Sequence, residues 1–198
     1  MQRSGQPFDA EYYARHYEDP RTRVACAASI ARLAAFVCSY LKYLRLPVRN
    51  VLDLGCGLGL WREPLAAHFP RARWQPVEWS DHLCARFGWQ KGSVLDYAGT
   101  ETFDLVICQG VLPYLDDRAC ARALANLARL CRGALYLEAI SAGDWAERVD
   151  QAATDGNVHL RTATWYRTRL ARAFTNCGGG LFVKRDSGTV LFELEQAE

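Results

Sequence analysis

Three glycines at alternate positions could hold a ligand against the polypeptide backbone. Gly55, Gly57 and Gly59 follow an apolar run at residues 51–54 and precede a helical pattern. Because glycine has no Cβ, the chain can turn tightly there and a ligand can lie within van der Waals reach of the backbone. In an open α/β sheet, such a loop lies in the ligand crevice at the carboxyl ends of the strands. The loop therefore predicts a ligand site, although Leu60 stands where a dinucleotide fingerprint has its third Gly or Ala.

An acidic residue could supply the second part of this site. The strand predicted at residues 74–77 ends in Glu78, nineteen positions after Gly59. A carboxylate at the tip of the neighbouring strand can accept hydrogen bonds from two ribose hydroxyls with its two oxygens. The loop and the acid together predict a ribose-bearing ligand.

The order of these motifs resembles the class I (Rossmann-like) S-adenosylmethionine-dependent methyltransferases. The pattern is two hydrophobic residues, Asp53, a hydrophobic residue and Gly-x-Gly-x-Gly, followed by an acid after the second strand. The resemblance continues through residues 92–96, 103–108, 111–116 and 133–138. It covers the chain from about residue 48 onward, strongly through Glu138 and more loosely after it.

The resemblance implies an α/β fold with a doubly wound, mostly parallel seven-stranded sheet, helices on both faces and an antiparallel C-terminal hairpin. It implies S-adenosylmethionine as cofactor, leaving as S-adenosylhomocysteine. Trp79 could contact the adenine or ribose or pack a helix, and Asp96 could accept the adenine amino group or begin a turn. The implied cofactor-binding residues are Asp53, Gly55, Cys56, Gly57, Gly59, Trp61, Glu78, Trp79, Leu95, Asp96, Gln109, Gly110 and Tyr114.

The acceptor side of the site is predicted after the fifth strand. Glu138 ends that strand at the crevice rim, and Glu138 or His159 could remove a proton from a hydroxyl acceptor as a catalytic base. Arg161, Trp165 and Tyr166 bring a cation and two aromatic rings to the region where such enzymes hold their substrate. Each has a structural alternative, since these aromatics could be core residues and a lone histidine is usually structural. No metal site is predicted.

The N-terminal segment carries aromatic and basic residues ahead of the first strand. In methyltransferases such a segment commonly forms a lid over the cofactor, and Tyr13 and Tyr17, with Arg21 and Arg23, are the candidates here. The alternative is that the aromatic residues pack the N-terminal helix on the body of the domain.

Hydrophobic spacing and capping residues predict one domain over residues 1–198. Its parts are a helical lid or cap region (1–47), a cofactor-binding half (48–140), and substrate-side helices with a hairpin (141–198). Apolar residues at intervals of three and four predict an amphipathic helix over residues 22–44. Asp116 is expected to cap a helix that includes Cys131 and is closed by Gly133. Strands at 181–184 and 190–194 are expected to form the hairpin through residues 186–188.

Composition excludes several classes of function. The formal net charge of +2 and the scattered arginines do not favour nucleic-acid binding. The eight cysteines include no CxxC motif and lie mostly in apolar patterns, which indicates reduced thiols in the cytoplasm. The apolar stretch at residues 24–41 is interrupted by Arg32 and is not expected to span a membrane. Catalysis by Cys56 is not expected, because no histidine is near in sequence.

These observations predict a methyltransferase that acts on an O or N atom of a small molecule, as a monomer or homodimer. The Asn-Pro-Pro-Tyr or Asp-Pro-Pro-Tyr tetrad of amide and exocyclic-amine methylation is missing after residue 108. A nicotinamide-dependent oxidoreductase is disfavoured by the missing third glycine and by the absence of a Tyr-x-x-x-Lys pair. A methyltransferase-like module that binds the cofactor without catalysis and acts through a protein partner remains the alternative.

Overall fold

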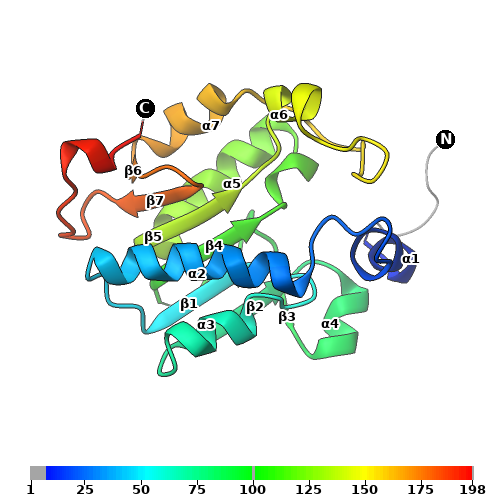
Figure 1. The fold of residues 1–198 in the computed structure, drawn as a ribbon, viewed down its shortest axis with the longest axis horizontal. Helices are drawn as coiled ribbons and strands as arrows, with labels where there is room; N and C mark the ends of the chain where they lie inside the picture. Colours follow the sequence, from blue (N-terminus) through cyan, green and yellow to red (C-terminus); the bar gives the residue numbers. More distant parts are fainter. Residues whose placement is uncertain (1–7, 100, 198) are drawn as a thin grey trace.

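A seven-stranded sheet forms the centre of the molecule (Figure 1). The computed structural model describes residues 8–99 and 101–197. The sheet order is β3-β2-β1-β4-β5-β7-β6; strands β1 to β5 pair in parallel, and β7 runs antiparallel to both β5 and β6. The strands are β1 Asn50–Leu54, β2 Arg73–Glu78, β3 Gln90–Lys91, β4 Phe103–Gln109, β5 Cys131–Glu138, β6 Phe174–Asn176 and β7 Leu181–Lys184. The predicted fold class is confirmed.

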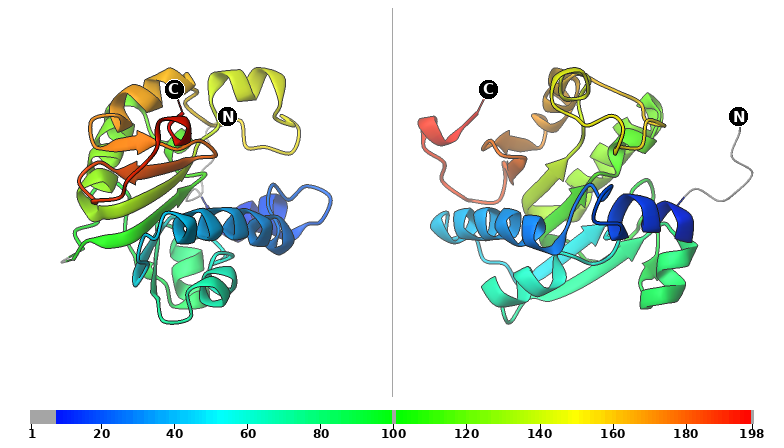
Figure 2. Two further views of the ribbon diagram at one scale, coloured as in Figure 1. Left: turned by 60° about the vertical axis from the view of Figure 1, so that its left-hand side comes forward. Right: turned by 45° about the vertical axis from the view of Figure 1, so that its right-hand side comes forward.

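Helices cover both faces of the sheet, as Figures 1 and 2 show. One face packs against α2 and α3, and the other against α5 and α7. The N-terminal elements lie beyond the carboxyl ends of the central strands. The helices are α1 Ala10–Tyr13, the π-helix η1 Ala14–Glu18, α2 Ala27–Tyr43, α3 Arg62–His68, α4 Asp81–Phe87, the 3-10 turn η2 Leu112–Tyr114, α5 Asp117–Leu130, α6 Ala142–Glu147, α7 Ala163–Leu170 and the 3-10 turn η3 Glu193–Glu195.

Alternation along the buried strands builds two core layers. Val51 and Leu105 point toward α2 and α3, whereas Leu52 and Val106 point toward α5, and all four are fully buried. Because successive side chains of a strand point to opposite faces, a strand buried on both faces is apolar throughout. The exception in β1 is Asp53, whose carboxyl group is buried at the end of the strand.

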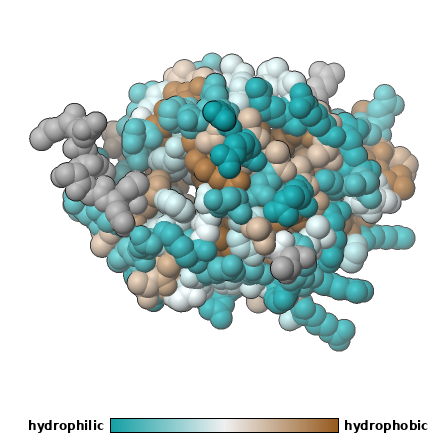
Figure 3. All heavy atoms as spheres, turned by 180° about the vertical axis from the view of Figure 1, so that it is seen from behind, coloured by the Kyte–Doolittle hydropathy of each residue, from teal (hydrophilic) through white to brown (hydrophobic). Residues whose placement is uncertain are grey.

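The surface seen from behind is mostly hydrophilic, with hydrophobic residues interspersed (Figure 3). In the described part of the chain, no helix is long and apolar enough to cross a membrane.

Two of the predicted helix boundaries are wrong. The helix predicted from residue 22 begins at Ala27, because the Val24 amide donates back to the His16 carbonyl oxygen at 2.8 Å. The Val24 side chain is left 47% exposed. The helix capped by Asp116 ends at Leu130, so Cys131 and Gly133 belong to β5. Strand β5 therefore follows α5 directly.

The predicted C-terminal hairpin has the wrong partner strand. Strand β7 pairs with β6, through a turn whose glycines, Gly178 to Gly180, all have positive φ angles. Residues 190–194 form no strand, and Val190 and Phe192 are 76% and 70% exposed. The glycine turn brings two short strands together and leaves the later apolar residues outside the sheet.

The position of Gly133 in β5 gives a stability prediction. A Cβ on this residue would meet the Asp104 backbone oxygen on β4 at 2.3 Å, which neither strand can relieve without moving. We expect Gly133→Ala to lower the free energy of unfolding in urea by about 1–3 kcal/mol. The control is Gly143→Ala on exposed α6, where the nearest heavy atom is 3.9 Å away and alanine favours the helix. Equal losses for the two variants would contradict the proposed crowding between β4 and β5.

Candidate functional site

A cavity of about 670 Å³ lies at the carboxyl ends of β1, β4 and β5. This volume falls in the usual range for small-molecule sites. Its walls come from four separate parts of the chain: the N-terminal segment, the glycine loop, the ends of β4 and β5, and the loop after α6. The principal lining residues are Tyr12, His16, Tyr17, Arg21 and Arg23; Asp53, Gly55, Cys56, Gly57 and Trp61; Gln109, Gly110, Tyr114 and Glu138; and Asp150, Ala153 and Asp155.

The glycine loop adopts a backbone that other residues would strain. Gly55, Gly57 and Gly59 have φ angles of 77°, 53° and 72°. A Cβ on Gly55 would lie 2.3 Å from the Val111 side chain, whereas one on Gly57 would meet no atom within 4 Å. The first glycine thus permits close packing against the chain after β4, and the second leaves open space beside the cavity.

Asp53 places a buried carboxyl group in the cavity wall. It is 2% exposed and accepts a hydrogen bond from Trp74 Nε1 at 3.3 Å. Burial raises the pKa of this carboxyl to about 7, and the nearby charge of Glu78 adds to the effect.

Glu78 holds the glycine loop rather than lining the cavity. Its Oε2 accepts from the Gly57 amide, and its Oε1 accepts from the amides of Trp79 and Ser80, each at 2.8 Å. Above it, Tyr13 is 5% exposed and packs with Leu83. Burial and the Glu78 charge raise the pKa of the Tyr13 phenol, which stays neutral. The predicted contact between Glu78 and a ribose remains a prediction.

A chain of hydrogen bonds orders the polar end of the cavity. Trp61 Nε1 donates to Gln109 Oε1 at 2.8 Å, and Gln109 Nε2 donates to Glu138 Oε2 at 3.0 Å. The Tyr136 hydroxyl donates to the same Glu138 oxygen at 3.2 Å. These bonds fix the orientation of the Gln109 amide and hold Glu138 at the rim with its other oxygen available.

Part of the predicted cofactor set lies away from the cavity. Gly59 packs against Trp89: a Cβ added at Gly59 would lie 2.9 Å from that ring. Trp79 is 54% exposed beneath the Lys91 ammonium group, which lies 4.5 Å from its ring. Leu95 packs on the core, and exposed Asp96 lies in a separate hollow beside β3. The other predicted cofactor residues line the cavity, apart from Glu78 behind the loop.

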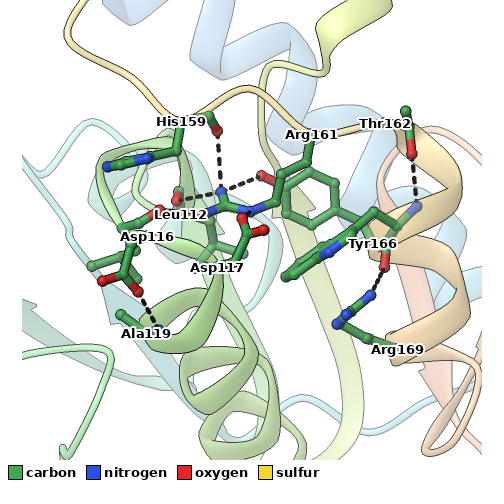
Figure 4. A network of polar contacts seen from close by, with 11 residues as sticks. Leu112, Asp116, Asp117, Ala119, His159, Arg161, Thr162, Tyr166 and Arg169 are labelled. Carbon is green, nitrogen blue, oxygen red and sulfur yellow. Dashed lines mark hydrogen bonds and ion pairs between the residues drawn. The ribbon is translucent and has the colours of Figure 1, made fainter.

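The predicted substrate residues after β5 form a structural brace (Figure 4). Arg161 is 4% exposed, and its guanidinium donates to Asp117 Oδ1 at 2.8 Å and to the Tyr166 hydroxyl at 3.3 Å. Trp165 packs against Arg169, whose guanidinium carbon is 3.6 Å from the ring centre. The His159 side chain is exposed and does not line the cavity. These side chains brace the chain or face solvent, which favours the structural alternative for all four residues, and a catalytic or substrate role stays a prediction.

The N-terminal segment, called the lid below, lies along one side of the cavity, and its closing over a cofactor stays a prediction. Tyr17, Arg21 and Arg23 line the cavity, whereas Tyr13 does not line it and packs with Leu83. The Tyr12 and Tyr114 hydroxyls are 2.7 Å apart and bond the lid to η2. Sequence reasoning missed Tyr12 and His16, although their spacing of four residues indicated one helix face.

The cysteines carry no catalytic chemistry at this site. All eight are free thiols in the structure. Burial raises the pKa of the Cys56 thiol, so it is not the thiolate that a nucleophile requires. Among residues 8–99 and 101–197, no group of three or more metal-ligating side chains is found.

The sheet order, the glycine loop after β1 and the cavity at the carboxyl ends of the strands define a class I methyltransferase fold. Residues 51–133 match the family model described as a methyltransferase domain. Together with the fold comparisons, this match supports a class I S-adenosylmethionine-dependent methyltransferase.

Three similar proteins illustrate the range of this class. Nodulation protein S from Rhizobium tropici is 34% identical over 93 residues, which are 42% of this chain and 39% of the relative. An O-methyltransferase family protein from Burkholderia thailandensis superposes with a TM-score of 0.62 at 19% identity, over 91% of this chain and 64% of that one. An amino pentose methyltransferase from Micromonospora echinaspora, in its S-adenosylmethionine-bound structure, gives a TM-score of 0.60 at 18% identity, over 82% and 92%. The match thus spans about two fifths of the curated relative's length.

Proposed function

We propose that this protein transfers a methyl group from S-adenosylmethionine to an O or N atom of a small molecule. The observation that carries this proposal is the cavity, in which the glycine loop and the ordered Gln109–Glu138 pair face the lid. Its volume of about 670 Å³ and its cover of lid residues suit a small acceptor bound beside the methyl donor.

The residues present fit this cofactor. Gly57 leaves open space beside the cavity, and Asp53, Gly55 and Gly110 surround the same volume. When bound, the cofactor supplies a methyl group activated by a positively charged sulfur. The protein then has to bind and orient the two reactants and exclude water from the cavity. Well-oriented reactants can lower the barrier by about 7–11 kcal/mol in this way.

Glu138 is the acceptor-side group in this proposal. Its Oε2 is held by Gln109 and Tyr136, so its Oε1 can accept a hydrogen bond from an acceptor hydroxyl or amine. This contact would orient the acceptor lone pair toward the methyl group. The amino pentose methyltransferase and the O-methyltransferase relative support an N or O acceptor without choosing between them.

Free thiols also bear on location and assembly. Eight unpaired cysteines fit a reducing compartment, and we propose the cytoplasm. A monomer or homodimer remains our prediction.

The test of the proposed function is calorimetric titration with S-adenosylmethionine, S-adenosylhomocysteine and NAD. We expect micromolar binding of the first two and none of NAD, because the glycine loop lacks the third glycine of a dinucleotide site. Labelled methyl donor would then be used to screen small hydroxyl and amine acceptors. Binding of NAD alone would refute the proposal.

Two variants test the assignment of the loop. We expect Glu78→Ala to weaken S-adenosylhomocysteine binding about tenfold or more, because the Gly57, Trp79 and Ser80 amides lose their common acceptor. Cys56→Ala should change the dissociation constant by less than about threefold, since its neutral thiol makes no required contact. Equal effects in calorimetry would show that the Glu78 carboxylate does not organise the loop.

A further inference from the structure

His16 is a buried imidazole in the lid that the proposed function has not used. It lies in η1, is 5% exposed, and lines the cavity between the glycine loop and the loop after α6. A titratable side chain on the wall of a ligand cavity is a candidate for proton transfer when its geometry is fixed.

The hydrogen bond at Nδ1 fixes the tautomer. His16 Nδ1 lies 3.1 Å from the backbone oxygen of Ala153, 137 residues away. A carbonyl oxygen can only accept, so Nδ1 carries the proton and the neutral ring has its lone pair on Nε2. The bond from Nδ1 to the carbonyl oxygen thus fixes the orientation of the imidazole ring.

The Nε2 atom belongs to a side chain of the cavity wall and takes no part in the bond to Ala153. Among residues 8–99 and 101–197, no group bonds to Nε2, although every fully buried side-chain nitrogen or oxygen in that range has a partner. An unpaired Nε2 is therefore not fully buried, and the ring lines the cavity. The lone pair is accessible to a bound molecule.

The ring is held from two sides. Its centroid lies 4.8 Å from that of Tyr12, and the Tyr12 hydroxyl bonds to Tyr114 at 2.7 Å. The His16 carbonyl accepts from the Val24 amide at 2.8 Å, which closes the chain after η1. A base fixed in this way needs little rearrangement when the acceptor binds.

We propose that His16 Nε2 is the general base of the methyl transfer, an inference that rests on the proposed function. As the acceptor lone pair forms its bond to the methyl carbon, the electron pair of the breaking S–CH3 bond goes to sulfur. The proton leaves the acceptor O–H or N–H for Nε2, giving an imidazolium and a methylated neutral product. The imidazolium then returns the proton to water as the lid opens.

The charged and titratable groups that share the cavity bear on this proton transfer. They include the guanidinium groups of Arg21 and Arg23 and the buried carboxyl group of Asp53. Burial raises the pKa of the phenols of Tyr12, Tyr17 and Tyr114, which therefore stay neutral hydrogen-bond donors or acceptors. Besides the two arginines and Asp53, the groups are Tyr12, Tyr17, Tyr114, Glu138, Asp150 and Asp155.

Glu138 is the competing base on the same cavity. Its Oε2 already accepts hydrogen bonds from Gln109 and Tyr136, which hold the carboxylate in place at the rim. Imidazole is intrinsically the stronger base by about two pKa units. His16 is therefore the proton acceptor, and Glu138 positions the acceptor.

The first test reads the imidazole directly. In ¹⁵N-histidine-labelled protein at pH 8, the His16 resonances, assigned by their loss in His16→Asn, should show a protonated Nδ1 and a bare Nε2. The same pattern is expected with S-adenosylhomocysteine bound. A proton on Nε2 of the neutral ring would overturn the assignment whatever the activity, because that nitrogen could not then accept one.

The second test uses His16→Asn, whose amide can still donate to the Ala153 oxygen but cannot act as a base. Catechol, glucosamine and tyramine are offered with labelled methyl donor, and any that the wild-type protein methylates is used. We expect kcat to fall about a hundredfold or more, the affinity for S-adenosylhomocysteine to stay within about threefold, and added imidazole to restore part of the rate of His16→Ala. His68→Asn, on α3 outside the cavity, should retain wild-type kcat.

The outcomes separate this inference from the proposed function. In one outcome the wild type binds the donor and methylates an acceptor, but His16→Asn has a kcat within about threefold of wild type and imidazole gives no rescue. That outcome would overturn the role of His16 as base and leave the proposed methyltransferase activity in place. No binding of either cofactor form by wild type would overturn both. If none of the three acceptors is methylated, the imidazole resonances decide whether His16 can accept a proton.

Discussion

Replacement of Arg161 by Lys is expected to lower the free energy of unfolding by about 3 kcal/mol or more. Besides Asp117 and Tyr166, the guanidinium donates to the backbone oxygens of Leu112 at 3.4 Å, His159 at 3.1 Å, and Leu115. Figure 4 shows these partners converging from η2, α5 and α7. The guanidinium is thus the common partner of three chain segments.

The size of the effect follows from geometry. A guanidinium presents five N–H donors in a planar fork, whereas an ammonium has three donors at one point and cannot reach the same set. The Leu112 oxygen keeps a donor in the Leu115 amide, and each of the other two carbonyl oxygens left without a donor costs about 1–3 kcal/mol. The ion pair with Asp117 adds little, since the Asp117 side chain is 76% exposed.

Urea denaturation would measure this prediction. The matched control is Arg148→Lys, because Arg148 pairs with Asp144 and Glu147 on the surface and is 67% exposed. We expect the control to change stability by less than about 0.5 kcal/mol. A similarly small loss for Arg161→Lys would show that the brace is not structural, and would restore a role in ligand binding.

The second large effect is expected at Asp53, as a dependence of stability on pH. Its pKa is raised from 3.8 to about 7 in the folded protein, so the native state binds a proton that the unfolded chain releases between these values. This linkage stabilises the fold below pH 3.8 and is lost as pH rises through 7. Asp53→Asn removes the cost of burying the charge and can still accept from Trp74.

We expect Asp53→Asn to be more stable than wild type by on the order of 2–4 kcal/mol at pH 8, with the gain shrinking toward pH 4. Thermal or urea unfolding at both pH values measures it. The control is Asp116→Asn at the exposed N-cap of α5, where aspartate and asparagine are both favourable capping residues. Its stability should stay within about 0.5 kcal/mol of wild type. A gain at Asp53 that did not vary with pH would contradict burial of a titrating carboxyl.

Local signals predicted the elements that depend on near neighbours. Asp116 caps α5 as expected, because its side chain accepts from the Ala119 amide three residues later. The glycine loop and the apolar runs of β1 and β4 were predicted for the same reason, since pattern and backbone freedom are local properties. These signals sufficed for the fold class and for the cofactor end of the cavity.

Features that depend on distant partners could not be predicted. Arg161 resembles a substrate-binding cation in sequence, but three of its partners lie 44 to 49 residues earlier. His16 is oriented by a carbonyl oxygen 137 residues away. Residues 190–194 are mostly apolar, as in a strand, yet within the described residues no strand pairs with that segment. Spacing along the chain carries no information on any of these contacts.

The contacts that join the lid to the rest of the molecule span long stretches of sequence. The Tyr12–Tyr114 and His16–Ala153 bonds close loops of 102 and 137 residues, whereas the sheet and its helices share an extensive core. Such a segment can detach as a separate cooperative unit at a free energy well below that of global unfolding. We therefore expect the lid to open at a lower free energy than the sheet unfolds, and its opening to set how readily ligands exchange.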